Sequence, residues 1–311
     1  MSLIFYYCCY LNYYKMKNKH LCLFGAALFG MVLLSASCEK MNLSGRSSNA
    51  DEGDANVVVR ITSFEQVPFS ATTRTAVGDV CNHLNFVVFD ENGERVDQKN
   101  QELGDEGFGE GRFTLPLGNY LLAIVAHSSD GNPSVNKRTE SKNESISFTN
   151  AKGYTDTFFA SKSLTVGDSA INLDMNLRRV VAKVRFINED AIPEKADSIR
   201  IYYEGGSGSI DAQSSYGNVK SKQTTWFDKR EAPFEIYTIP WQDDAYLEAT
   251  IGAFQAGDLL TSTVIDSIPI RRNCITTCRG ALFDGKVTKV SFTITVDDSW
   301  GTPINYQIPT K

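Results

Sequence analysis

Cysteine and histidine often carry out catalysis or bind metals, and both are scarce in this chain. The sequence has seven cysteines and three histidines among 311 residues. Cys274 and Cys278 are neighbours in sequence, but on a strand they would lie about 13 Å apart, which is too far for a disulfide bond. Zinc would need further ligands, and His83 and His127 are distant in sequence. We therefore predict no metal site, and we expect both cysteines to be small buried strand residues.

The histidines and glycines do not form a catalytic motif either. No Ser-His-Asp arrangement stands in a nucleophile-elbow context, and no glycine-rich segment has the spacing of a phosphate-binding loop. We expect His83 and His127 to be solvated residues at strand ends. A glycosidase needs two carboxyl groups about 5–10 Å apart, but nothing in the sequence singles out such a pair. The sequence thus predicts neither an enzyme nor a bound cofactor.

One cysteine stands where a covalent modification is expected. An apolar run from Leu21 to Leu34 follows Lys17 and Lys19 and ends in the small residues that precede Cys38. The run is short for a bilayer span, and the order of basic, apolar and small residues is that of a secretory signal. A cysteine directly after the cleavage site is the lipid acceptor of bacterial lipoproteins, so we predict lipidation of Cys38. The alternative is an ordinary signal peptide with a coincidental cysteine.

The signal begins unusually far from the first methionine. Residues 1–15 carry five tyrosines and a single charge, whereas Met16 opens a stretch that is typical of a signal start. We therefore place the true start at Met16. Removing residues 1–37 leaves 274 residues and changes the formal charge from −6 to −9, because the removed part has three lysines and no acid. This acidic balance argues against a nucleic-acid partner.

The remaining sequence predicts an all-β protein. Residues 38–56 are polar and small, which indicates a flexible tether. From Val57 onward, short apolar-alternating segments are separated by turn residues every 8–12 positions, a pattern that favours β-sandwiches. No window shows a sustained helical period. Because this length suits two domains, we predict two tandem sandwiches, residues 57–176 and 177–311.

Four segments lead to specific structural predictions. Segment 57–64 has alternating apolar residues on one side, and segment 84–96 is typical of a hairpin. Segment 128–156 is a polar insertion that we expect to be a long loop. Segment 177–186 is predicted to be one half-buried strand with a basic outer row, which either faces solvent or pairs with acidic residues between the domains.

The order of these features points to a known family. Its more specific parts are "LRRVVAKVRF" at 177–186 and "IPIRRNCITTCRGALF" at 268–283. They follow the lipoprotein signal, "SATTRTAVG" at 70–78 and "LNFVVFDENGERV" at 84–96, and they precede "VSFTITVDDSW". Together, in this order, the segments resemble the fimbrillin superfamily, which comprises the type V pilus subunits and pilus anchors of Bacteroidota.

The resemblance implies a fold and a structural function. It implies two β-sandwich domains of transthyretin-like type and export as a lipoprotein that reaches the surface of the outer membrane. In shaft subunits of that family, an arginine-specific protease removes the lipidated segment, and a strand of a neighbouring subunit fills the groove that opens. Anchor subunits keep their lipid. The expected partners are therefore other pilus subunits, the outer membrane, and a host or bacterial surface ligand for adhesion.

Individual residues can be assigned to these implied steps. Arg46 lies in the tether, and Arg74 lies just beyond the first predicted strand, so both are candidate processing sites. The alternative is that they lie in polar segments that are never cut. The C-terminal segment is a candidate donor strand. Alternatively, it is the last strand or a loose tail of its own domain. Its apolar side consists of Ile304, Tyr306 and Ile308.

Tryptophan suggests a different function. Trp226, Trp241 and Trp300 could stack on sugars if they are exposed, although aromatic residues in sandwiches are more commonly core or rim residues. The competing hypothesis is therefore a surface lipoprotein that binds glycans and does not polymerise.

Overall fold

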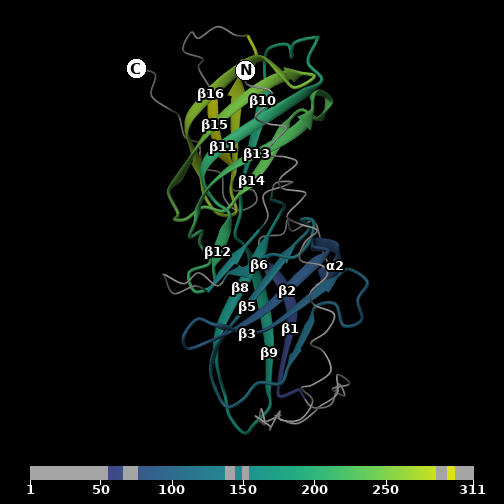
Figure 1. Ribbon diagram of the computed structural model, residues 1–311, viewed down its shortest axis with the longest axis vertical. Coiled ribbons are helices and arrows are strands. Elements are labelled where there is room, and N and C mark those ends of the chain that lie inside the picture. The colour runs from purple at the N-terminus through teal and green to yellow at the C-terminus, as the bar shows by residue number, and fades with distance from the viewer. Residues whose placement is uncertain (1–54, 66–75, 137–143, 149–153, 285–292, 298–311) are drawn as a thin grey trace, which may run out of the picture. The chain divides into compact units, whose positions relative to one another are not determined.

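The protein is nearly all β-structure. The computed structural model describes residues 55–65, 76–136, 144–148, 154–284 and 293–297, and all of them belong to one compact unit. Within these ranges the only helices are the four-residue α2 (Val77–Val80) and the 3₁₀ helix η2 (Lys229–Glu231). Figure 1 shows the strands and the turns and loops that join them. The all-β prediction is confirmed, while the domain boundary at residue 177 stays a prediction.

The first half of the described chain forms a seven-stranded sheet with the order β3-β2-β5-β8-β9-β1-β4. Its strands are β1 (Val57–Glu65), β2 (His83–Asp90), β3 (Arg95–Glu102), β4 (Glu110–Phe113), β5 (Gly118–His127), β8 (Phe158–Val166) and β9 (Ile171–Arg179). Strands β2 and β3 form the predicted hairpin. Strand β1 pairs in parallel with β9 and antiparallel with β4. The first described strand is therefore an internal strand of its sheet.

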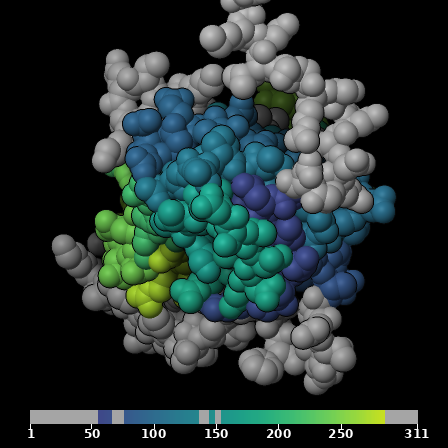
Figure 2. Space-filling view, turned by 90° about the horizontal axis from the view of Figure 1, so that it is seen from below, coloured from purple at the N-terminus to yellow at the C-terminus, as the bar shows by residue number. Residues whose placement is uncertain are grey.

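One face of this sheet carries a continuous apolar core. The alternating residues Val57, Val59 and Ile61 of β1 pack there with side chains from β2, β5 and β9. The sequence alternation predicted this inward row correctly. In Figure 2 the purple residues of β1 reach the surface beside the teal residues of its neighbour β9. On the opposite side of β1, Val58 is buried but Arg60 and Thr62 are exposed, so that side is partly accessible from solvent.

The later part of the chain forms two four-stranded sheets. One has the order β14 (Phe234–Thr238), β10 (Ala182–Asn188), β17 (Ile275–Gly280) and β18 (Thr293–Asp297). The other has the order β13 (Lys220–Asp228), β11 (Ser198–Ser207), β15 (Ala245–Gln255) and β16 (Asp258–Ile270). Side chains of both sheets, among them Phe186 of β10 and Ile251 of β15, share one buried cluster. Two sheets over a common core are the arrangement of a β-sandwich.

Segment 177–186 is not one strand, contrary to the expectation. Strand β9 ends at Arg179, strand β10 begins at Ala182, and the two strands belong to different sheets. Val180 and Val181, which separate them, are buried in a third apolar cluster. Alternation alone missed the break because both linking residues are apolar and fit a buried strand.

The polar insertion is also more ordered than expected. It contributes β6 (Ser134–Asn136) and β7 (Ser145–Ser147), and β7 pairs antiparallel with β12 (Ser209–Asp211). Ile146 of β7 is fully buried in the third cluster together with Val87 and Phe89 of β2. The long-loop interpretation is therefore wrong for these strands. They cover the second face of the seven-stranded sheet, so β2 is buried on both sides.

Candidate functional site

Strand β1 is held by two ladders of unequal length. Its pairing with β9 runs from Val57–Ile171 to Glu65–Arg178, with a register shift between Ile61 and Ser63. Its pairing with β4 covers only Val57 to Arg60, followed by one more bond, from the Ile61 amide to the Gly109 carbonyl at 2.9 Å. The first half of β1 is therefore bonded on both sides, and its second half is paired mainly on one side.

Apolar burial contributes strongly to the stabilisation of β1. Val59 is completely buried, Val57 is 1% exposed and Ile61 is 8% exposed. Fully burying a side chain of this size stabilises by about 1.5–3 kcal/mol, so the three together contribute roughly 5–9 kcal/mol. If β1 left the sheet, it would expose a row of apolar side chains and the unpaired backbone groups of two strands.

Charged side chains join this strand to each of its neighbours. Arg60 lies 2.7 Å from the carboxylate of Glu110 on β4, and Arg178 of β9 lies 2.7 Å from the carboxylate of Glu65. The Asn176 amide also donates to Glu65, at 2.6 Å. Exposed ion pairs of this kind contribute little energy. They do match the register of β1 to each neighbour, because a shift by one residue would separate the charges.

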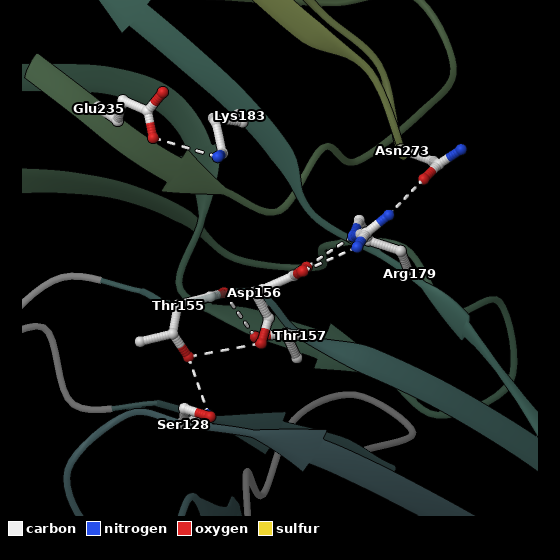
Figure 3. Close-up of polar contacts among 8 residues, drawn as sticks. All are labelled: Ser128, Thr155, Asp156, Thr157, Arg179, Lys183, Glu235 and Asn273. Atoms are coloured by element: carbon white, nitrogen blue, oxygen red, sulfur yellow. Dashed lines mark hydrogen bonds and ion pairs between the residues drawn. The ribbon is translucent and has the colours of Figure 1, made fainter. Parts of the chain in front are cut away.

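A buried polar cluster fixes the end of β9 (Figure 3). Arg179 is only 4% exposed, and its Nε and Nη2 donate to the two Asp156 carboxylate oxygens at 2.6 and 2.8 Å. Its Nη1 donates to Asn273 Oδ1 at 2.9 Å, and its guanidinium lies 4.8 Å from the centroid of the Phe158 ring. A two-pronged guanidinium–carboxylate pair of this kind is strong and directional. The main neighbour of β1 is therefore anchored independently of β1.

The basic residues of β10 pair with an acidic residue of the neighbouring strand β14 in the same sheet, so the expected pairing between domains stays a prediction. Lys183 and Arg185 of β10 contact the Glu235 carboxylate at 3.1 and 2.6 Å. Burial alone would raise the pKa of Glu235, but hydrogen bonds from Arg185 and Lys183 outweigh it and hold this pKa below its ordinary value. This row is therefore committed to internal ion pairs.

His127 does not behave as predicted. His127 is completely buried, stacks on His83 with 5.2 Å between ring centroids, and contacts Phe148 edge-on. Its Nε2 lies 2.9 Å from Asn85 Oδ1. Burial, followed by the neighbouring His83, lowers the pKa of His127 to about 4. The prediction of a solvated strand end is wrong for His127, because Phe148 from the insertion packs against it.

The three described cysteines, Cys81, Cys274 and Cys278, are buried. Cys278 is a buried strand residue as expected, whereas Cys274 lies directly before β17 rather than in it. Burial raises the pKa of Cys278, and likewise that of Cys81, to about 12. A thiol with such a pKa stays protonated at neutral pH and is a poor nucleophile. In the part of the chain that the structure describes, no three His, Cys, Asp or Glu side chains are grouped to hold a metal ion.

Most residues that the sequence assigned to function lie outside the described ranges. These are the lipidation site Cys38, the candidate cleavage sites Arg46 and Arg74, and the candidate donor residues Ile304, Tyr306 and Ile308. Their roles stay predictions. Between residue 55 and Asp297, as far as these residues are described, no helix is long and apolar enough to cross a membrane.

The two described tryptophans differ in exposure. Trp226, on β13, is 51% exposed, whereas Trp241 is partly buried against the core of the two four-stranded sheets. Trp241 lines a surface cleft that Trp226 does not reach. Sugar stacking by both tryptophans stays a prediction, and the two do not line one common cleft.

Comparisons with solved structures return proteins of Bacteroidota. A DUF1812 protein of Bacteroides thetaiotaomicron has a TM-score of 0.49 at 12% identity, over 81% of this chain and 98% of that protein. The fimbrial anchor protein Mfa2 of Porphyromonas gingivalis has a TM-score of 0.45 at 12% identity, over 81% and 99%. A fimbrial assembly protein of Parabacteroides distasonis has a TM-score of 0.40 at 13% identity, over 78% and 93%.

Family membership follows from the sequence comparison. No curated protein sequence matches the chain. Residues 51–306, however, match the family described as fimbrillin-A associated anchor proteins Mfa1 and Mfa2. This match spans the seven-stranded sheet, both four-stranded sheets and the buried cluster around Arg179. The chain therefore belongs to the family of fimbrillin-A associated anchor proteins.

Proposed function

We propose that the chain is a fimbrial subunit or anchor that a lipid on Cys38 holds at the surface of the outer membrane. We further propose that it assembles with other fimbrial subunits by β-strand exchange and supports adhesion. Family membership supports the fimbrial role. The observation that carries the exchange is the position of β1, the first described strand after the predicted tether, as an internal strand of its sheet.

Strand exchange needs an acceptor slot and a donor. Removing β1 would leave a slot between β9 and β4, with an apolar floor and unpaired backbone groups on both sides. A strand from another subunit can replace β1 by pairing with both edges. In this proposal the donor is a C-terminal segment whose Ile304, Tyr306 and Ile308 take the inward positions that Val57, Val59 and Ile61 occupy.

The two candidate arginines would give different products. Arg46 precedes β1, so a cut there removes the lipid and leaves β1 in the sheet. Arg74 follows β1, so a cut there separates both the lipid and β1 from the rest of the chain. An anchor is cut at neither position. The state of these two bonds therefore distinguishes an anchor from a subunit with an open slot.

Two measurements test the proposal. Intact-mass analysis of the protein from native membranes reports the acyl chains, the first residue and any cut at Arg46 or Arg74. Size-exclusion chromatography then compares intact protein with protein cut between β1 and α2, each mixed with fimbrial subunits of the same cell. We expect complexes with the cut protein that disappear when excess β1 peptide is added. Cut protein that stays monomeric with every subunit contradicts strand exchange.

The alternative function, glycan binding without polymerisation, predicts the opposite result in this assay. The protein would stay monomeric after cutting and would bind sugars in either state. One observation favours a sugar-binding role beside the fimbrial one, namely the cleft that Trp241 lines.

A further inference from the structure

A surface cleft of about 800 Å³ lies on the sheet formed by β13, β11, β15 and β16. Its lining includes Glu204 of β11, Lys222 of β13, and Tyr246 and Glu248 of β15. On these strands alternate side chains such as Tyr203 and Ala249 face the core, so Glu204, Tyr246 and Glu248 project to the opposite face. The volume is within the range of small-molecule sites. The strand-exchange proposal does not use this cleft.

Irregular pairing shapes the cleft. The register shifts between Glu204 and Gly206 on one side of β11, and between Leu247 and Ala249 in the pairing of β15 with β16. Gly205 has a φ of +105°, and a Cβ there would lie 2.3 Å from the Tyr246 carbonyl oxygen. Only glycine fits at this position. Bulges locally bend and twist strands, and they are common beside binding sites.

Two aromatic residues line the cleft in different ways. Tyr246 is 51% exposed. Folding gains little from a tyrosine ring that stays in solvent, so its exposure needs another explanation. Trp241 is packed against the core on one side, and the Lys220 ammonium lies 4.4 Å from the centroid of its ring. The exposed ring of Tyr246 and the packed ring of Trp241 both give the cleft flat apolar surface, and a ligand can contact it at a low cost in side-chain conformational entropy. The apolar C–H face of a pyranose ring is a fitting partner for such a surface.

The charged residues around these rings favour hydroxyl groups. Glu204 and Glu248 are direct cross-strand partners, an arrangement that costs energy for like charges. Lys222 lies 3.0 Å from Glu204, and Asp266 and Lys220 complete the polar rim. Three carboxylates and two ammonium groups leave a balance close to neutral. Carboxylates accept hydrogen bonds from neighbouring hydroxyl groups, whereas a polyanionic ligand would be repelled by three of these five groups.

We propose that this cleft binds a neutral polysaccharide, with one pyranose ring stacked on Tyr246 and its hydroxyl groups donating to Glu248 and Glu204. This deepens the adhesion part of the proposed function and is independent of strand exchange. It also differs from the sequence-based hypothesis, because Tyr246 rather than Trp226 carries the stacking.

The test measures sugar binding by the intact, detergent-solubilised chain. The probes are neutral hexasaccharides of glucose, mannose and galactose, and hexagalacturonic acid is the acidic probe. Isothermal titration calorimetry measures the binding of each probe. We expect at least one neutral probe to bind and Tyr246→Ala to weaken it tenfold or more. Glu248→Gln should weaken it several-fold. Trp226→Ala is the matched control, since Trp226 is equally exposed on the same sheet but outside the cleft, and it should change binding less than twofold.

Three results would overturn the inference: no neutral probe binds, only the acidic probe binds, or Trp226→Ala removes binding while Tyr246→Ala keeps it. Circular dichroism of each variant checks the fold, and Tyr246 and Glu248 are exposed, so these variants should fold normally. Because binding is measured on uncut monomer, a negative result leaves strand exchange untouched. Failure of strand exchange likewise does not affect the sugar result.

Discussion

Replacing Val59 by alanine tests whether buried side chains hold β1 in its sheet. Val59 is completely buried in the core beneath the seven-stranded sheet. The change removes two methyl groups and leaves a cavity, which together cost about 2–3 kcal/mol. Since about 1.4 kcal/mol is a tenfold change in an equilibrium constant, a severed β1 should be held roughly 30- to 150-fold more weakly.

The assay uses the full chain with a specific protease site introduced between β1 and α2. After cutting, a fluorescent peptide with the sequence of residues 52–66 competes for the slot, and its uptake reports the loss of the resident strand. Ser63→Ala is the control, because Ser63 is exposed on the same strand. We expect fast uptake only for Val59→Ala. Equal uptake by the two variants and the unchanged protein would refute the role of the buried row.

Three further predictions concern the buried polar and titratable groups. Because the folded pKa of His127 is about 4 and the ordinary value is 6.5, the unfolded chain takes up the proton first. The contribution of neutral His127 to the free energy of unfolding is then fully present above pH 6.5, and about 3 kcal/mol of it is lost as the pH falls to 4. Urea titrations at several pH values should show this decrease, and His127→Gln should flatten it. Arg179→Met should lower the free energy of unfolding by about 3–5 kcal/mol, whereas the exposed neighbour Arg178→Met should change it by less than about 1 kcal/mol; chemical denaturation measures both. Cys278, with its raised pKa and complete burial, should resist iodoacetamide at pH 8 in the folded protein and react in urea, as mass spectrometry would show.

Local alternation was sufficient to predict strands that are buried on one face. The inward row of β1 and the hairpin of β2 and β3 follow directly from their sequences. Alternation failed where both faces are buried. Val87 and Phe89 point away from the first core and into the third, and β7, which covers them, is a three-residue strand with serines at both ends. Its only apolar residue, Ile146, pairs with Ile210 of β12, a contact between distant segments that no local pattern encodes.

The candidate sites show the same division between local and long-range information. The burial of His127 depends on Phe148 from the insertion, so its position at the end of an apolar run was misleading. The cleft depends on two register shifts, which arise from pairing between strands. One local signal was nevertheless present. In segment 245–254, Tyr246 occupies the polar side of the alternation beside Glu248, and an aromatic residue on an outward row is a reason to look for a ligand.

The unequal ladders of β1 reconcile stable anchoring with release. In the proposed function, a pull on the lipid reaches β1 at Val57, where β9 and β4 both bond the strand. Both ladders must then break together before the strand moves. A cut at Arg74 instead frees the other end, where residues from Ser63 to Glu65 are paired with β9 alone among the described strands. Fraying can start there one bond at a time, and an incoming strand can follow. In this proposal, the same strand resists force in an uncut anchor and becomes replaceable once the chain behind it is severed.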